Sequence, residues 1–231
     1  MSYSVAVRAL CEFSAKVGDL DLRFTPSPTA QEGIEGHRRV VARRAAGYES
    51  EIPLEGEYQA LRVRGRADGY DPACNRLEEI KTHRGDLARQ PANHRQLHWA
   101  QAKVYAWLMC QARQLPAIEV ALVYLDVDDD GQTLISEHHT AGDLQVFFEA
   151  QCQRFLAWAH YQQQRLAERD HGLQALTFPY PQFRQGQRQL SETLYKAVST
   201  GRCLMAQAST GIGKTLGTLF PMLKAMVPQQ L

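Results

Sequence analysis

Three features are missing from this 231-residue chain, and each absence excludes a class of protein. No run of about 18 apolar residues occurs, so we expect no membrane-spanning helix. The first residues, MSYSVAVRALCEF, hold no basic stretch followed by an apolar one, so we expect no secretory signal. The five cysteines form no C-x-x-C pair, which argues against a zinc site or a disulfide framework. These absences favour a protein of the reducing cytoplasm.

A strong charge of either sign is also missing from the chain as a whole, whose net charge is +1. The two ends differ, however: residues 1–175 carry 20 Lys and Arg against 24 Asp and Glu, whereas residues 176–231 carry six against one. This change of sign predicts two units. Within the first unit, residues 37–44 and 81–113 are rich in basic side chains. Each block is either a phosphate-facing surface or a solvated helix face.

The composition, with 44% hydrophobic residues, is that of a globular protein, and its periodicity predicts an α/β fold for the first unit. Helices are expected at residues 30–46, 94–114 and 141–168. Strands are expected at residues 4–13, 19–24, 50–56, 60–70, 76–82, 117–127 and 132–138. The last two strands form a hairpin around the DDDG turn. That turn also satisfies an EF-hand expression, but its β-rich flanks exclude a site that needs two helices.

The helical pattern ends after residue 168, where ERDHGLQALTFPYPQF introduces two prolines and a glycine. We place a boundary near residue 172, which gives units 1–172 and 173–231. The second unit is expected to hold a helix at 184–199, a short strand at 203–207, a glycine loop and a helix from 214. Because a nucleotide-binding α/β domain needs about 100–200 residues, we expect a piece of a longer or an interrupted protein.

The segment GRADGYDPACNRLEEIK places two carboxylates and a lysine where they can meet. Glu79 and Lys81 are two residues apart on a strand and therefore share a face. Asp68 ends the preceding strand, and the turn between the strands can bring it close to Glu79. Clustered carboxylates repel one another, and a hard cation such as Mg²⁺ relieves that repulsion. Such a cation lowers the pKa of a bound water, which Lys81 can hold.

Two helices add polar side chains at inward-facing positions. His37 lies on the apolar stripe of the first predicted helix, and Gln101 interrupts the apolar stripe of the second, one turn before Tyr105. With GRAD, a ten-residue gap and E-I-K, this set resembles the RecB-like form of the PD-(D/E)xK nucleases over residues 30–127. The resemblance implies a restriction-endonuclease-like core, a mixed sheet flanked by helices.

The resemblance also implies roles for these residues. His37, Asp68, Glu79 and the Ile80 carbonyl would bind Mg²⁺ or Mn²⁺. Lys81 would serve the attacking water, and Gln101 and Tyr105 would orient the site or the DNA strand. Some relatives carry a four-cysteine iron–sulfur cluster, but the cysteine spacings here offer no such ligand set, so we expect none.

The second unit contains a phosphate-loop pattern. In ASTGIGKT, the glycines let backbone N–H groups face phosphate oxygens at the start of a helix. Lys214 would reach the β- and γ-phosphates, and Thr215 would hold Mg²⁺. The loop resembles motif I of DinG/XPD-like superfamily 2 DNA helicases, and the preceding FPYPQFRQGQRQL resembles their Q motif. The resemblance implies an ATP site made by Gln187, Gly211, Gly213, Lys214 and Thr215, the first reading adenine. No acidic box follows in these residues, so we expect this segment to be an incomplete P-loop unit without ATPase activity of its own.

Together the patterns predict a metal-dependent DNA nuclease joined to the start of an ATP-dependent DNA helicase. Its substrate would be single-stranded or forked DNA, in repair or in processing of foreign DNA, and its location the cytoplasm at the nucleoid. Two alternatives stay open. The nuclease fold is a catalytically silent module that holds DNA, or it is a protein-interaction adaptor for the motor. The mode and polarity of cutting do not follow from the sequence.

Overall fold

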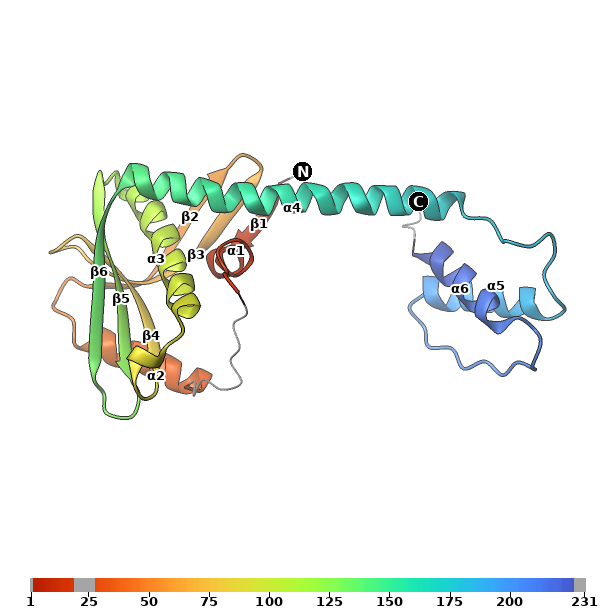
Figure 1. Cartoon of the computed structure of the whole chain (residues 1–231), viewed down its shortest axis with the longest axis horizontal. Helices are drawn as coiled ribbons and strands as arrows, with labels where there is room; N and C mark the ends of the chain where they lie inside the picture. The colour runs from red at the N-terminus through yellow and green to blue at the C-terminus, as the bar shows by residue number, and fades with distance from the viewer. Residues whose placement is uncertain (1, 19–27, 227–231) are drawn as a thin grey trace. The chain divides into compact units, whose positions relative to one another are not determined.

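The computed structural model describes residues 2–18 and 28–226 and divides into two compact units, Met1–Trp158 and Ala159–Leu231 (Figure 1). Helix α4 (Ala141–Ala175) contributes to both. It continues through residue 172, where the sequence places the domain boundary, so that assignment stays a prediction. None of the described helices combines the length and the apolarity that a membrane crossing requires.

The first unit is built on one six-stranded mixed sheet (Figure 1). Its order is β1-β3-β4-β5-β6, and β2 pairs with β3 outside this path. The pairs β1–β3 and β4–β5 are parallel, and the other pairs are antiparallel. The strands are β1 (Tyr3–Ala6), β2 (Glu49–Tyr58), β3 (Leu61–Asp71), β4 (Arg76–His83), β5 (Ala117–Asp126) and β6 (Gln132–Thr140). This confirms the predicted α/β class with a mixed sheet flanked by helices.

Strand β3 has an unusual neighbourhood. Because β2 occupies one edge of β3 along most of its length, β1 and β4 must share the other edge. β1 pairs with residues 61–64 and β4 with residues 69–71. Residues 65–68 of β3 therefore have no strand beside them on that edge. This gap in the ladder lies where the predicted carboxylates are.

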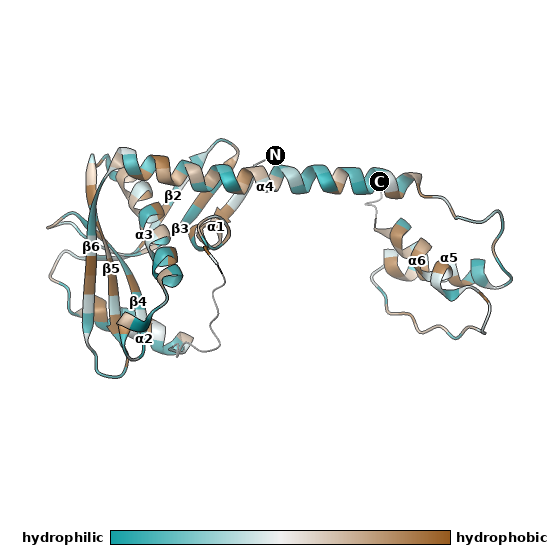
Figure 2. Cartoon of the chain, in the orientation of Figure 1, coloured by the Kyte–Doolittle hydropathy of each residue, from teal (hydrophilic) through white to brown (hydrophobic). Residues whose placement is uncertain are grey.

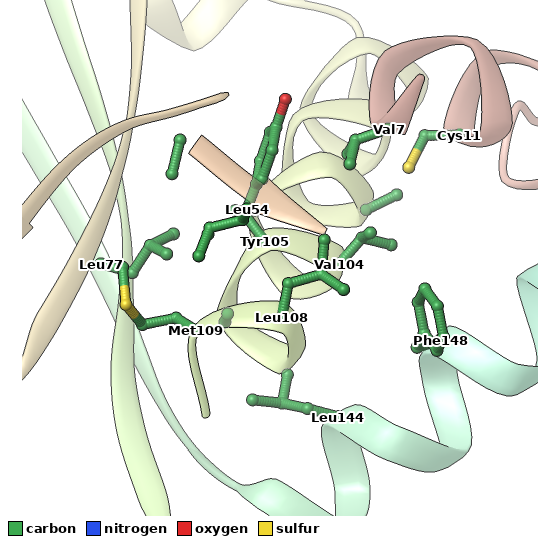
Figure 3. Close-up of a cluster of buried hydrophobic side chains, with 14 of the residues drawn as sticks. Val7, Cys11, Leu54, Leu77, Val104, Tyr105, Leu108, Met109, Leu144 and Phe148 are labelled. Carbon is green, nitrogen blue, oxygen red and sulfur yellow. The ribbon is translucent and has the colours of Figure 1, made fainter. Parts of the chain in front are cut away.

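Helices cover both faces of the sheet. α2 (Ala30–Ala42) packs on one face, where Val40 meets Ile80, Val123 and Leu125. A capping box between Thr29 and Glu32 starts this helix. α1 (Val7–Ser14), α3 (Ala92–Arg113) and the start of α4 pack on the other face and enclose the main core (Figure 3). The apolar run of β5 lies between the two layers (Figure 2).

Most predicted elements of the first unit are confirmed to within a few residues, and one is wrong. The strand expected at 4–13 ends at Ala6, and the chain continues as α1. The buried residues Val7, Leu10 and Cys11 recur at helical spacing, whereas a strand would have exposed every second residue. The predicted strand at 19–24 lies outside the described residues. α4 is seven residues longer than predicted.

The second unit is small and helical. α5 (Gln187–Ser199) packs on α6 (Lys214–Ala225), where the Ser191 hydroxyl donates to the Gly217 carbonyl at 2.9 Å. The strand predicted at 203–207 is wrong, because these residues form no regular structure and the Met205 side chain is fully exposed. A strand is stable only beside another, and residues 159–226 contain no strand to pair with it.

Candidate functional site

The gap beside β3 is bridged by a side chain. The Oδ2 atom of Asp68 accepts a hydrogen bond of 2.8 Å from the backbone N–H of Ile80 on β4. The carboxylate thus replaces the backbone carbonyl that a continuous ladder would have offered to this N–H group. β3 and β4 diverge at this point, and the divergence leaves room for polar side chains between them.

Both β2 and β3 change their alternation at the same place. The core residues of β3 are Leu61, Val63 and Ala67, but the next one is Tyr70, so the buried face shifts from odd to even numbers. The residue opposite Asp68 on β2 is Glu51, which has a φ of 53° and no regular pairing. This left-handed conformation costs a non-glycine residue about 1–2 kcal/mol.

His37, Glu51 and Asp68 converge at this kink. Each offers a ligand atom, and these atoms all lie within 4.8 Å of one another. The distance from His37 Nδ1 to Asp68 Oδ1 is 3.7 Å. All three line a pocket of about 680 Å³ between α2 and the sheet, with Arg38 and Arg66 among its other residues.

The pKa values show how poorly this pocket tolerates uncompensated charge. Burial, followed by the neighbouring charge of Glu79, raises the pKa of Asp68 to about 8. Burial, followed by the positive charge of Lys81, lowers the pKa of His37, although the charges of Glu79 and Glu51 oppose the shift. The neutral imidazole is the form that can ligate a metal.

Glu79 and Lys81 share a face of β4, as predicted, and form a pair in which Lys81 Nζ lies 2.6 Å from Glu79 Oε1. They lie on the face of the sheet that packs on α3, because Ile80 between them packs on α2. Glu79 is therefore near the His37–Glu51–Asp68 group but is not one of its members. Its other oxygen, Oε2, is buried and has no hydrogen-bond partner among the described residues.

Gln101 and Tyr105 are both buried on α3. The Tyr105 hydroxyl lies over Gly65, where the gap in the β3 ladder begins and where a larger side chain would collide with it. Burial, followed by the charges of Glu79 and Asp68, raises the pKa of Tyr105 above its ordinary range. Figure 3 shows its ring within the core and its hydroxyl at the edge of the cluster. The predicted catalytic residues thus approach the gap from both faces of the sheet.

Most arginines of the block at 37–44 are engaged in ion pairs. Arg39 and Arg43 pair with Asp130 in the β5–β6 turn, and Arg44 Nε donates to Glu78 Oε2 at 2.8 Å. Arg38 remains largely exposed at the pocket. The block is therefore neither a simple solvated face nor a continuous phosphate-binding surface.

A different row of basic side chains leads to the pocket. Arg62, Arg64 and Arg66 alternate with buried residues on β3, two residues apart, and Asp68 follows them. Arg62 pairs with Glu55. Arg64 and Arg66 form no ion pair within the described part of the chain, so their charges are available to a ligand.

Two features of this region escape sequence reasoning. Glu51 is exposed and begins an ordinary strand pattern, so no sequence signal marks it. Glu78 is completely buried and accepts hydrogen bonds from Arg44, Tyr48 and Arg76. The two adjacent acidic residues of EEIK, in a buried strand, were a possible sequence signal for this hydrogen-bond network around Glu78. The network links the segment after α2 to β4, the strand that carries Glu79.

The predicted nucleotide residues also meet in the structure. Gln187, Gly213 and Thr215 line a pocket of about 490 Å³ that Tyr180 and Arg184 complete. Lys214 begins α6 and folds back over the loop, donating to the carbonyls of Ala208 and Ser209 at 3.1 Å each.

The loop is held by the segment before α5. Gln187 Nε2 donates to the Gly213 carbonyl at 2.9 Å, and its Oε1 accepts from the Arg184 N–H at 3.0 Å. Arg184 Nη1 donates to the Gly211 carbonyl at 2.7 Å. Both glycines have positive φ values, which glycine adopts without strain. Arg184 is a third residue, after Glu51 and Glu78, that the sequence analysis did not identify.

Comparison with known proteins gives one partial similarity in sequence. This chain resembles part of a helicase. Over 46 residues it is 44% identical to a probable ATP-dependent helicase of Methanocaldococcus jannaschii, a match that covers 20% of this chain and 7% of that protein. No family model matches the chain. The solved structure of SSO0001 aligns with 66% of this chain and 77% of its own length, at 19% identity and a TM-score of 0.42.

The donor set at the kink fits a divalent cation. It combines one imidazole with carboxylates from two strands, and a further buried carboxylate oxygen nearby lacks a partner. Burial first, and the charge of Glu79 second, raise the pKa of Asp68, so its ionised form is poorly compensated by the surrounding side chains. A cation such as Mg²⁺ or Mn²⁺ supplies that compensation and accepts oxygen ligands, and Mn²⁺ also accepts imidazole nitrogen.

Proposed function

We propose that residues 1–172 are a metal-dependent DNA nuclease domain and that residues 173–231 begin an ATP-dependent DNA helicase. The observation that carries the nuclease is the convergence of His37, Glu51 and Asp68 on one pocket, beside the Glu79–Lys81 pair. A histidine and carboxylates at a break in a sheet, next to a lysine, suit hydrolysis of a phosphodiester better than they suit a structural role.

In this proposal His37, Asp68, Glu79 and the Ile80 carbonyl hold Mg²⁺ or Mn²⁺. The cation would neutralise charge on the scissile phosphate and lower the pKa of its bound water. Asp68 is anchored by the Ile80 N–H group, which fixes its carboxylate at the gap. His37 comes from α2, whose end is tied to β4 by the Arg44–Glu78 pair.

Lys81 acts as a positive charge and hydrogen-bond donor. Burial alone would lower its pKa, but the nearby carboxylates of Glu79 and Asp68 outweigh burial and raise the pKa of Lys81. It therefore stays protonated, and it can hold the attacking water or stabilise the charge that develops on the phosphate. Gln101 and Tyr105, on α3, orient the site or the DNA strand from the other side of the gap.

The DNA backbone would approach along β3. Arg64 and Arg66 present charge toward solvent in a row that ends at Asp68, and Arg38 lines the pocket from α2. Contacts with phosphates position a strand without reading its sequence. Single-stranded or forked DNA is the substrate we propose, because the pocket is reached from a single row of cations.

The helicase part rests on the loop between α5 and α6 and on the partial likeness to an ATP-dependent helicase. Lys214 and Thr215 stand at the N-terminus of α6, where backbone N–H groups favour phosphate. Gln187 and the loop glycines complete the proposed site for ATP with Mg²⁺. Hydrolysis would also need an acidic residue, and none of the described residues that line this pocket is acidic.

The nuclease is tested with end-labelled single-stranded, duplex and forked DNA, each with Mn²⁺, Mg²⁺ or EDTA. We expect metal-dependent cutting by the wild-type chain, lowered about 100-fold or more in Asp68→Asn and Lys81→Ala. Asp71→Asn, on the same strand but outside the pocket, is the matched control and should cut normally. If the folded wild-type chain binds DNA but never cuts it, the fold is a silent DNA-binding module.

The DNA path is tested by affinity at several salt concentrations. Arg66→Ala should weaken binding of single-stranded DNA and reduce the salt dependence by about one phosphate contact. Arg62→Ala, whose side chain already pairs with Glu55, should change affinity much less. Equal effects of the two substitutions would contradict the proposed path.

A further inference from the structure

Glu51 has a backbone conformation that its position in the fold does not require. Five non-glycine residues have a positive φ in the part of the chain that the structure describes: Glu51, Gln59, Asn75, Gln114 and Asp130. The last four lie in turns between strands or at the end of α3, where left-handed residues are ordinary. Glu51 instead lies inside β2. Such a strained residue persists only where the surrounding structure holds it in place.

The strain has a geometric consequence. In a regular strand, Glu51 and Ile52 would point to opposite faces, and the ladder would pair Glu51 with Asp68. The left-handed turn interrupts that pairing, while Ser50 and Ile52 on either side keep theirs. The Glu51 carboxylate consequently lies within 4.8 Å of the ligand atoms of His37 and Asp68 and lines the same pocket.

The charge of Glu51 has no partner in this place. The described residues include no Lys or Arg in an ion pair with it, and the ligand atoms grouped with it belong to His37 and Asp68. Arg38 and Arg66 line the pocket but do not pair with it. Lys81 partly offsets the charge of Asp68, but no described cation pairs with Glu51, so the side chains alone do not account for two carboxylates placed this close together. A divalent cation between them does.

We propose that Glu51 is a further ligand of the divalent cation at the His37–Asp68 site. The proposal rests on the metal site of the proposed nuclease and adds to it a residue from β2. Glu51 contributes one carboxylate oxygen, and its left-handed backbone is the feature that directs this oxygen into the pocket. With an imidazole among its ligands, the site favours Mn²⁺ over Mg²⁺, because Mg²⁺ takes nitrogen ligands reluctantly.

The test measures Mn²⁺ binding in the absence of DNA. Calorimetry gives the affinity, and the metal-dependent rise in the unfolding temperature gives an independent measure of binding. The whole chain is used, as wild type, Asp68→Asn, Glu51→Gln and Glu51→Gly. We expect Glu51→Gln to weaken Mn²⁺ binding about 10-fold or more, since it keeps the size of the side chain and removes the charge.

Gln59→Gly is the matched control for the backbone. Gln59 has nearly the same φ as Glu51, 51° against 53°, but lies in the turn between β2 and β3. Glycine at either position relieves the left-handed strain, so both variants should unfold at a higher temperature without metal. Only Glu51→Gly should also lose affinity for Mn²⁺.

The possible results separate this inference from the proposed function. If the wild-type chain and Asp68→Asn respond to Mn²⁺ equally weakly, the metal site itself is refuted, and the inference with it. If the wild-type chain binds Mn²⁺, Asp68→Asn does not, and Glu51→Gln binds as the wild type does, the site stands and Glu51 is not a ligand. In that case its left-handed backbone only shapes the strand.

Discussion

The two units of this chain hold their candidate sites by different means. In the first, side chains from α2, β2, β3 and β4 meet at a break in a sheet, and residues far apart in sequence supply them. In the second, a loop without regular structure is held by three side chains, those of Arg184, Gln187 and Lys214, which donate to its carbonyls. The first site therefore depends on the packing of a whole domain, and the second depends on a few local bonds.

The cores of the two units differ in the same sense. The first encloses buried apolar side chains from four of its strands, β2 to β5, and from α1, α3 and α4. In the helices α5 and α6 the buried residues are Gln187, Ser191, Gly217 and Pro221, none of them a large apolar side chain. Because burial of apolar surface dominates folding free energy, the first unit should be much the more stable.

The largest expected effect sharpens this comparison. Leu122 is completely buried in β5, and Leu122→Ala should destabilise the first unit by about 2–5 kcal/mol. Leu190 on α5 is only partly buried, and Leu190→Ala should cost the second unit about 1–2 kcal/mol. All three tryptophans, Trp99, Trp107 and Trp158, belong to the first unit, so their fluorescence during denaturant unfolding reports that unit alone.

Hydrogen exchange of the α5 and α6 amides reports the second unit. Val146→Ala, on an exposed position of α4, is the control for Leu122→Ala and should change stability by less than about 0.5 kcal/mol. If Leu122→Ala shifts the exchange of α6 as much as it shifts the tryptophan signal, the two units unfold together and the comparison fails.

The same contrast explains what the sequence could predict. The phosphate loop and the E-I-K strand are local patterns, so Lys214 with Thr215, and Glu79 with Lys81, could be placed on their elements from spacing alone. Their partners could be found only where periodicity set them on an inward face, as for His37 and Gln101. Glu51 could not be found, because its role depends on a left-handed residue inside a strand, which no pattern marks.

The failed strands have related causes. In the segment after Ala6, the apolar residues fit both the alternation of a strand and the spacing of a helix. Packing of this segment against α3 favours the helix. The run at 203–207 has strand-like composition, yet a strand also needs a neighbour, which is a property of the fold and not of the segment.

The next prediction concerns pH and would distinguish the buried acidic site from the loop. In EDTA, the pKa of Asp68, raised by burial to about 8, lies far above its value of 3.8 in the unfolded chain. Between these values the folded chain binds more protons at this carboxyl, so stability falls as pH rises and levels off above about pH 8. The pKa values of His37 and His98 are lowered in the folded chain, so these two residues change stability only below about pH 6.5, where their protonation would destabilise the fold. From pH 6.5 to 8 we therefore expect a loss of about 1–2 kcal/mol.

Asp68→Asn should remove this slope, and Mn²⁺ should reduce it in the wild-type chain by binding the ionised carboxylate. The helices α5 and α6 contain one carboxylate, the exposed Glu192, so exchange of their amides, corrected for its intrinsic pH dependence, should give a constant stability over this range. An unchanged slope in Asp68→Asn would show that another group is responsible.

The smallest expected effect concerns the two loop glycines, which differ only in their surroundings. Gly211 and Gly213 have φ values of 88° and 82°, so alanine at either position should cost about 1–2 kcal/mol of local stability. A side chain at Gly211 would meet nothing within 4 Å, whereas one at Gly213 would collide with the Gln187 amide. Gly213→Ala must therefore also disrupt the bond from Gln187, which adds about 1 kcal/mol. Hydrogen exchange of the first α6 amides measures the difference. Equal protection in the two variants would mean that Gln187 does not hold the loop, and the second site would then depend on the bonds from Arg184 and Lys214 alone.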